Sequence, residues 1–398
     1  MDEKKIIIDR AVLVGLNADC FTPEETSSEK TLDELEALLE TAGGACVGKV
    51  LQNRHTPDPH SFIGEGKADE VRQMVQNGGA NLVIFDNDLT PSQLRALEDL
   101  MKTPVLDRSA LILDIFAQRA RTREGKLQVE LAQYQYYLPR LTVWNEEMGR
   151  LIRRKIQKLE EELAEVRKVR AVQRQRRIKN SVPVVALVGY TNAGKSTLLN
   201  LLTGADIPAN NRLFDTLDTT TRQLTLSDTC DVLLSDTVGF IAKLPHHLVE
   251  AFKATLEELE YADLLIHVID ASDPERTAHM QVVERLIGEL AKPGVPVIDC
   301  YNKCDLLPDD EIPRGRDAVA ISAATGMGIE ELKKTAETLL GRGLHHVKLL
   351  LPYSMGGQVD VLHSQAKVLS CEYQPDGIAV EAIMDETLFG RLRQYKAE

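Results

Sequence analysis

The most informative segment of the sequence runs Gly189-Tyr190-Thr191-Asn192-Ala193-Gly194-Lys195-Ser196-Thr197. It fits the phosphate-binding pattern G-x-x-x-x-G-K-[ST], follows the apolar run Val184–Val188 and leads into the helix-like run Leu198–Leu202. This order predicts a strand, a loop whose N–H groups surround phosphate oxygens, and a helix. Lys195 is expected to meet the β- and γ-phosphates, and the Ser196 hydroxyl to ligate Mg²⁺. A chance match would lack the strand before the loop and the helix after it.

A second loop predicts which base is bound. Asn302-Lys303-Cys304-Asp305 follows the apolar run Val295–Tyr301 and fits the pattern N-K-x-D. In this pattern the aspartate accepts hydrogen bonds from the N1–H and the exocyclic amine of guanine, while the lysine stem covers the ring. Adenine offers no such pair of donors, so the loop favours guanine. The strand-like run Ala318–Ile321 then leads to Ser322-Ala323-Ala324, where a backbone N–H is expected to meet the guanine O6.

Two segments between these loops are expected to respond to the γ-phosphate. Asp236-Thr237-Val238-Gly239 fits D-x-x-G, with the aspartate holding the magnesium shell and the glycine N–H contacting the γ-phosphate. The Thr-rich stretch Phe214–Arg222 predicts the other segment, in which we expect Thr220 to ligate magnesium, with Thr219 and Thr221 as competitors. The predicted catalytic residues are therefore Lys195, Thr220 and Gly239, and the predicted magnesium ligands are Ser196, Thr220 and Asp236.

The residue after the D-x-x-G pattern is Phe240, where many GTPases carry a glutamine that orients the attacking water. This replacement predicts slow intrinsic hydrolysis that depends on a group from a partner or on a monovalent cation. Asn192 lies where potassium-stimulated GTPases carry a ligating asparagine, although asparagine also stabilises tight turns. The expected ligands are thus GTP or GDP with Mg²⁺, and K⁺ is a further candidate.

Composition and charge exclude several other classes of protein. The formal net charge is −14, which argues against a protein that coats nucleic acid, and no DNA partner is expected. No apolar run reaches the roughly 18 to 20 residues of a membrane span, and the start of the chain does not resemble a secretory signal, so we expect a soluble, cytoplasmic monomer without a membrane partner. The six cysteines lack C-x-x-C pairs and nearby histidines, which predicts reduced thiols rather than a zinc site or disulfides.

The first hundred residues alternate strand-like and helix-like segments, which predicts parallel strands with crossover helices. The expected strands are Ile6–Val14, Ala45–Leu51, Leu82–Phe85 and Pro104–Leu106. The expected helices are Leu32–Leu39, Lys67–Val75 and Pro91–Leu100.

A long helical hairpin is predicted next. Apolar residues recur at steps of four and three in a seam formed by Ile152, Ile156, Leu159, Leu163 and Val166. The natural partner of this seam is a preceding helix over Ser109–Tyr137, with Pro139 in the turn between them. The stretch Arg150–Lys179 is strongly basic, and the ordinary interpretation of such a run is a solvated helical face.

The sequence therefore predicts an α/β protein whose mostly parallel P-loop GTPase sheet is one of several parts. We expect an N-terminal α/β domain over 1–108, an antiparallel helical hairpin over 109–180, the GTPase domain over 181–344, and a small α+β domain over 345–398.

The sequence resembles the HflX family of ribosome-associated GTPases, within the Obg-related group. The resemblance covers nearly the whole chain and rests on Phe62–Lys67, Asp88–Gln93, Val105–Arg108, Ile115–Ala117, Leu127–Gln133, Phe214–Arg222 and Asp236–Ile241. A phenylalanine after D-x-x-G is similar to the family pattern. The resemblance implies binding to the large (50S) ribosomal subunit and its rRNA, hydrolysis stimulated by the ribosome, and a role in ribosome splitting, rescue or the stress response. It also favours contact between the basic stretch and rRNA phosphates.

The sequence departs from that family between Leu141 and Arg153. The family carries there a glycine-rich loop and a G-P-G-E-x-x-L-E-x-D-R-R run, whereas Thr142–Gly149 passes directly into Arg150. The departure is typical of a divergent paralogue, and it bears on ribosome splitting more than on GTP binding.

Two other functions compete with a ribosome-stimulated GTPase. One is a slowly hydrolysing regulatory G protein that switches a non-ribosomal protein partner, and ribosome dependence of hydrolysis separates the two. The other is a separate nucleotide or RNA activity of the N-terminal part, which has no motif behind it because Gly64-Glu65-Gly66 lacks the third glycine of a dinucleotide loop.

Overall fold

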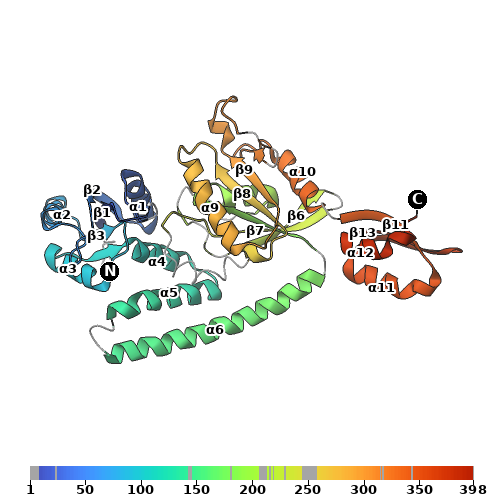
Figure 1. The fold of residues 1–398 in the computed structure, drawn as a ribbon, viewed down its shortest axis with the longest axis horizontal. Helices are drawn as coiled ribbons and strands as arrows, with labels where there is room; N and C mark the ends of the chain where they lie inside the picture. Colours follow the sequence, from blue (N-terminus) through green and yellow to red (C-terminus); the bar gives the residue numbers. More distant parts are fainter. Residues whose placement is uncertain are drawn as a thin grey trace, which may run out of the picture.

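The computed structural model contains three β-sheets arranged along the long axis of the molecule, with a pair of long helices beneath the first two (Figure 1). It describes residues 9–22, 25–141, 146–179, 182–205, 213–214, 217, 219–227, 230–243, 258–313, 315, 318–341 and 344–397. The strand expected over Ile6–Val14 begins outside these residues. Thr142–Asn145, which belong to the segment in which the sequence departs from the family, also lie outside them.

The N-terminal sheet is fully parallel with the order β2-β1-β3-β4. Its strands are β1 (Arg10–Ala18), β2 (Ala45–Arg54), β3 (Leu82–Phe85) and β4 (Val105–Asp107), and its crossover helices are α1 (Glu29–Ala42), α2 (Glu65–Gly78) and α3 (Pro91–Met101). Ser28 and Thr90 cap α1 and α3, each through a reciprocal capping box. The central strand β1 is buried on both faces, as a parallel strand covered by helices requires. The predicted alternation is confirmed.

Three helices connect this sheet to the next one: α4 (Arg108–Arg119), α5 (Arg123–Leu141) and α6 (Glu146–Lys179). The prediction of a single helix over Ser109–Tyr137 is wrong, because the chain leaves the helix at Ala120. The physical reason is burial: most residues of α4 are buried, and the helix packs against α1 and the sheet, whereas α5 pairs with α6. Periodicity within one segment does not reveal that the two halves have different partners.

The predicted seam of α6 is confirmed for Ile156, Leu159, Leu163 and Val166. Its residues pack against an apolar stripe of α5 in one cluster formed by Leu127, Leu131, Tyr134, Ile156, Leu159, Leu163 and Val166. Pro139, however, lies inside α5 and not in the turn. Tyr136 and Arg140 on either side of it both bind Asp107, and these tertiary contacts hold the last helical turn despite the proline.

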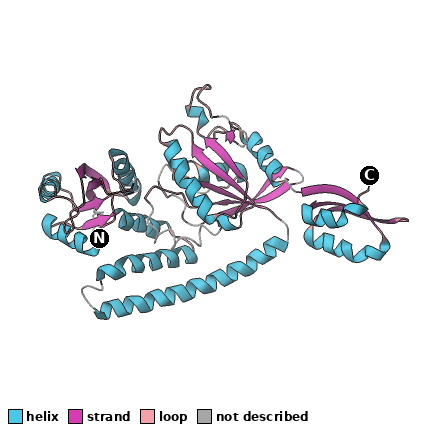
Figure 2. Cartoon of the chain, viewed as in Figure 1, coloured by secondary structure: helices cyan, strands magenta, loops and turns pink. Residues whose placement is uncertain are grey.

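The central sheet has the order β10-β9-β8-β5-β7-β6, and every strand pair is parallel except β6 with β7. Its strands are β5 (Val184–Gly189), β6 (Thr220–Ser227), β7 (Cys230–Asp236), β8 (Leu264–Asp270), β9 (Val297–Asn302) and β10 (Ala318–Ala320). Its described helices are α7 (Lys195–Thr203), α9 (Arg276–Leu290) and α10 (Ile329–Leu340). Helices cover both faces of this sheet (Figure 2). The mostly parallel P-loop fold is confirmed.

The chain ends in a small antiparallel sheet with the order β11-β13-β12. It consists of β11 (Leu344–Leu351), β12 (Lys367–Gln374) and β13 (Gly377–Asp385), with α11 (Gly356–Gln365) and α12 (Glu386–Leu392) packed on it. Among the described residues no helix combines the length and the hydropathy that a bilayer span needs.

Candidate nucleotide-binding site

The predicted nucleotide loops meet at the carboxyl edge of the central sheet, because they follow β5, β7 and β9, which run parallel in the order β9-β8-β5-β7. Two backbone hydrogen bonds join the P-loop to the D-x-x-G segment: Thr191 N–H donates to the Phe240 carbonyl (2.7 Å), and Phe240 N–H donates to the Gly189 carbonyl (3.1 Å). Gly239 lies in this contact, and a Cβ there would come within 2.9 Å of the Thr191 methyl group. The close approach explains why glycine is required.

Lys195 and Ser196 begin α7 and point toward the centre of these loops. The buried Lys195 ammonium donates to the carbonyls of Gly189 (3.0 Å) and Tyr190 (2.8 Å), and burial lowers the pKa of this ammonium to about 8. Ser196 Oγ donates to Asp236 Oδ2 over 2.8 Å. Hydroxyl and carboxylate oxygens in this arrangement are the donors that Mg²⁺ prefers beside a bound phosphate, so the residues fit the ion.

The register of β6 separates two of the candidate switch threonines. Thr220 pairs with Asp236, so both side chains lie on the same face of the strand pair. Thr221 pairs with Ser235 on the opposite face, with the two hydroxyl oxygens 3.4 Å apart. This register favours Thr220 over Thr221 as the neighbour of Asp236. The expected switch residues at 215, 216 and 218 lie outside the described part of the chain.

The residues that we expect to read guanine line a pocket of about 230 Å³ that opens beside the P-loop. The residues around it are Asn192, Gly194, Thr197, Asn302, Lys303, Asp305, Leu306, Ser322, Ala323 and Ala324. Asn302 joins three loops, since its Nδ2 donates to the Ala193 carbonyl and its Oδ1 accepts from Ala323 N–H, both over 2.9 Å. The structure thus brings the P-loop, the N-K-x-D loop and the Ser322-Ala323-Ala324 segment to one cavity.

Sequence reasoning missed one partner of the guanine-reading loop. Asp270 ends β8, the strand next to β9, and its Oδ2 accepts from Lys303 Nζ over 2.6 Å. The ion pair fixes the lysine stem that is expected to cover the base. The signal was present in the sequence, because Asp270 directly follows an apolar strand at the same sheet edge.

The P-loop also touches the N-terminal part of the protein, which sequence reasoning missed entirely. Within the central part, the ring of Tyr190 stacks on His279 of α9, with the ring centroids 3.8 Å apart. The Tyr190 hydroxyl accepts from Ala242 N–H (2.7 Å) and donates to Glu34 on α1. Burial, with the charge of Glu34, raises the pKa of this hydroxyl well above its usual value, so it remains a donor.

Comparison with known families divides the chain into three matching stretches. Residues 29–117 match the family described as GTP-binding GTPase N-terminal, residues 119–151 match GTP-binding GTPase Middle Region, and residues 184–303 match 50S ribosome-binding GTPase. The first stretch runs from α1 into α4 and leaves out β1, the second covers α5 and the start of α6, and the third covers the central sheet from β5 through the N-K of the N-K-x-D loop.

Similar proteins match over nearly the full length. The chain is 43% identical over 408 residues to the GTPase HflX of Caldanaerobacter subterraneus subsp. tengcongensis, with 97% of this chain and 94% of that protein covered. It is 42% identical to the GTPase HflX of Escherichia coli K12, with 86% of each covered. The crystal structure of SsGBP in complex with GDP superimposes with a TM-score of 0.52 at 26% identity, over 84% of this chain and 99% of that one. With the site geometry and identities of this order over almost all of its length, the chain belongs to the HflX family of GTPases.

Proposed function

We propose that this GTP-binding, GTP-hydrolysing protein works on the large ribosomal subunit, where contact with the subunit stimulates hydrolysis, and that it acts in ribosome splitting, rescue or the stress response. The observation that carries the proposal is an exposed basic helix in a protein whose D-x-x-G segment is followed by Phe240 and not by the water-orienting glutamine of many GTPases. The match of residues 184–303 to a family described as 50S ribosome-binding GTPase supports it.

The proposed roles at the phosphates follow from the geometry. Lys195 and the N–H groups at the start of α7 would neutralise the β- and γ-phosphates, and the Gly239 N–H would hold the γ-phosphate. Ser196, Thr220 and Asp236 would hold Mg²⁺, which supplies further positive charge at the phosphate oxygens. Of these residues, Lys195, Thr220 and Gly239 are the ones we assign to catalysis.

The side chain that follows D-x-x-G does not orient water. Phe240 is 1% exposed and belongs to an apolar cluster, and its backbone N–H and carbonyl both bond to the P-loop. Slow intrinsic hydrolysis follows, because the attacking water must be oriented by another group. Asn192 adopts a left-handed conformation (φ 62°) at the rim of the pocket, and we propose its side chain as a ligand for a stimulating K⁺.

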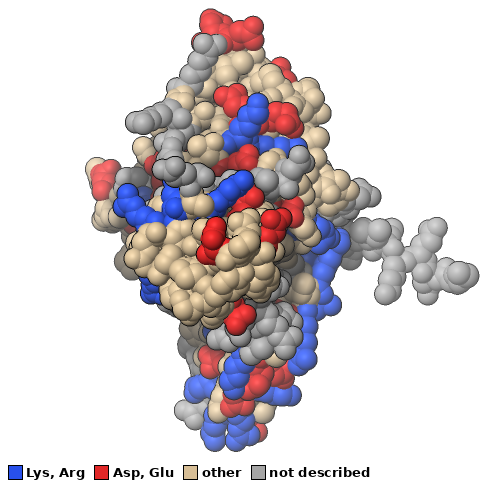
Figure 3. Space-filling model, turned by 90° about the vertical axis from the view of Figure 1, so that its right-hand side faces the viewer, with Lys and Arg blue, Asp and Glu red and all other residues tan. Residues whose placement is uncertain are grey.

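The surface that would meet rRNA is the first half of α6. Lys and Arg side chains gather at the lower end of the molecule, where the helical pair lies (Figure 3). Several of them are paired: Lys155 with Glu130, Lys158 with Glu162, and Lys168 with Glu165. Arg153 and Arg154 are exposed and make no ion pair with any described residue. Two neighbouring guanidinium groups that form no ion pair within the described part of the chain are suited to phosphate oxygens.

Sedimentation with purified 50S subunits tests this surface. The double variant Arg153→Gln/Arg154→Gln should weaken binding and lower the slope of log affinity against log salt by about 1.5, as expected for two lost phosphate contacts. Lys333→Gln/Lys334→Gln removes the same charge from α10 and serves as the control. An equal loss of 50S binding in the two double variants, or no loss of binding in either, would contradict a role for α6.

The second candidate remains a regulatory G protein with a non-ribosomal protein partner. It would be favoured if the wild-type chain bound GTP tightly but did not sediment with 50S subunits or 70S ribosomes in either nucleotide state.

A further inference from the structure

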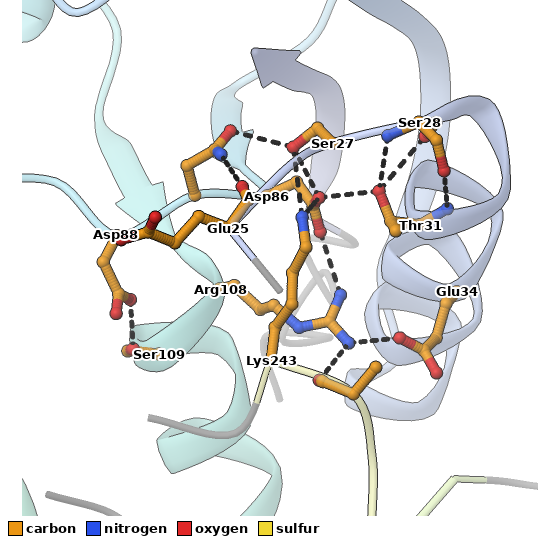
Figure 4. Close-up of polar contacts among 12 residues, drawn as sticks. Glu25, Ser27, Ser28, Thr31, Glu34, Asp86, Asp88, Arg108, Ser109 and Lys243 are labelled. Carbon is orange, nitrogen blue, oxygen red and sulfur yellow. Dashed lines mark hydrogen bonds and ion pairs between the residues drawn. The ribbon is translucent and has the colours of Figure 1, made fainter. Parts of the chain in front are cut away.

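The carboxyl edge of the N-terminal sheet holds a side chain from the GTPase part. In a parallel sheet of order β2-β1-β3-β4, the crevice that usually accepts a ligand lies between β1 and β3, where the crossovers leave on opposite faces. Here Asp86 follows β3 at that crevice, and its Oδ2 accepts from Ser27 and Thr31, each over 2.7 Å (Figure 4). The same oxygen binds the ammonium of Lys243. The Lys243 ammonium thus occupies the crevice between β1 and β3 in which such sheets usually bind a ligand.

Arg108 makes a second contact between the two parts. Its Nη1 binds Asp86 Oδ1 over 2.9 Å, and its Nη2 donates to the carbonyl of Ala242 over 3.1 Å and also binds Glu34 (Figure 4). Asp86 and Arg108 are buried. Burial alone would raise the pKa of Asp86, but the charges of Arg108 and Lys243 hold the pKa of its carboxyl below the usual value. The network is therefore ionic and largely shielded from water.

The two residues held in this way directly follow the segment that we expect to sense the γ-phosphate. Ala242 and Lys243 come directly after D-x-x-G-F-I, and Ala242 N–H also donates to the P-loop residue Tyr190. Lys243 has a left-handed backbone conformation (φ 54°), which is unfavourable for a lysine and is held here by its contacts. A shift of the D-x-x-G segment would therefore displace both contacts with the N-terminal sheet.

Asp107, the neighbour of Arg108, holds the end of α5. Its Oδ2 binds Arg140 Nη2 over 2.9 Å, and its Oδ1 accepts from the Tyr136 hydroxyl over 2.7 Å. The Arg140 guanidinium also lies 3.5 Å from the centre of the Tyr136 ring. Asp107 caps α4 by accepting from Ala110 N–H, so the backbone between Asp107 and Arg108 is fixed where β4 passes into a helix.

We propose that the Asp107-Arg108 pair links the nucleotide state of the GTPase site to the position of the C-terminal end of α5. When the D-x-x-G segment shifts, Arg108 and Asp86 lose or regain Ala242 and Lys243. Asp107, the last residue of β4, then transmits the change to Tyr136 and Arg140. Arg108 is a positioning residue in this linkage, since its described side-chain bonds go to Asp86, Glu34 and Ala242 and not to residues that line the nucleotide pocket. Linkage is reciprocal, so anything that displaces the α5 end alters the preference for GTP over GDP by the same factor.

This linkage goes beyond the ribosomal role and rests only on nucleotide binding by the proposed site. Hydrogen exchange of residues 134–140 in the full-length protein, compared between GDP and a non-hydrolysable GTP analogue, measures it directly. The wild-type exchange rates should differ by at least about fivefold between the two nucleotides, the lower end of typical coupling. Lys243→Met should reduce the difference to less than about twofold, because it removes the ammonium while leaving the Asp86–Arg108 pair.

Lys30→Met is the matched control. Lys30 on α1 pairs with Glu275 beside α9, so it bridges the same two parts, but its side chain is 70% exposed and the pair contributes little. This variant should keep the wild-type difference. A wild-type protein without any difference, or a Lys243→Met variant that keeps it, would overturn the linkage.

The reciprocal experiment measures how a change at the α5 end alters nucleotide affinities. Arg140→Met, at the α5 end, should change the ratio of GDP to GTP-analogue affinities by about fivefold or more, although Arg140 does not line the pocket. An unchanged ratio would overturn the linkage. Titration of the wild-type chain with a fluorescent GDP comes first, because a failure to bind there contradicts the nucleotide site itself and not the linkage.

Discussion

Ser196 and Asp236 are 40 residues apart in the sequence, yet the serine hydroxyl donates to the aspartate over 2.8 Å where the P-loop meets the D-x-x-G segment. The contact brings together a hydroxyl and a carboxylate, two oxygen groups that we propose as ligands of Mg²⁺. Substitution of Ser196 is therefore the most direct test of the proposed metal site.

Ser196→Ala should raise the Mg²⁺ concentration for half-maximal GTP turnover by about tenfold or more, because one oxygen ligand is lost. A magnesium titration of the steady-state rate measures the change. Thr203→Ala is the control, since Thr203 lies on the same helix and its hydroxyl bonds only to the Leu199 carbonyl among the described contacts. Equal magnesium requirements in Ser196→Ala and wild type would remove Ser196 from the metal site.

Gly239→Ala should reduce single-turnover hydrolysis by about a hundredfold, because a displacement of reacting groups by about 1 Å has an effect of this size. The added Cβ would lie 2.9 Å from Thr191 Cγ2 and 3.1 Å from Lys195 Nζ, so the γ-phosphate side of the site must shift. GDP affinity should change by less than about threefold. Gly288→Ala on α9 has nothing within 4 Å of its new Cβ and should behave like wild type. Unaltered hydrolysis in Gly239→Ala would refute the assigned contact.

Asp305→Asn should lower GTP affinity by at least about a hundredfold, because the amide presents a donor where guanine also donates. Xanthosine triphosphate, which accepts at that position, should gain affinity. Competition titrations with both nucleotides give the ratio, and Asp309→Asn, an exposed change in the loop that follows, is the control. Full GTP affinity in Asp305→Asn would show that this pocket does not read the base.

Intrinsic GTP hydrolysis should be faster in potassium than in sodium buffer at equal ionic strength. Asn192→Gly should abolish the difference, and glycine accommodates the left-handed conformation of this residue without strain, so the P-loop keeps its shape. Steady-state rates of both proteins in both buffers provide the comparison. Equal wild-type rates in the two buffers would exclude K⁺ as a cofactor.

The nucleotide loops were predictable because each is a short pattern that directly follows an apolar strand. The P-loop, D-x-x-G and N-K-x-D segments follow β5, β7 and β9, and the geometry of a parallel sheet brings them together without further information. The domain boundaries at 108, 180 and 344 stay a prediction.

The contacts that cross between the sheets were not predictable from local patterns. Asp86 and Lys243 are 157 residues apart, and neither stands in a motif with a known spacing to the other. In the sequence, Arg108 stands out only as part of a segment that resembles the family. Nothing in the sequence shows that it is buried between two carboxylates. The break between α4 and α5 was missed for the same reason, because burial of α4 depends on a helix some seventy residues earlier in the chain.

GTP turnover in potassium buffer, with and without purified 50S subunits and 70S ribosomes, tests the central claim most directly. We expect 50S subunits or 70S ribosomes to raise the turnover rate by at least about tenfold, well within the contribution that a partner-supplied group can make. An unchanged turnover rate at saturating ribosomes, with GTP binding intact, would contradict a ribosome-stimulated GTPase and favour a switch for another protein partner.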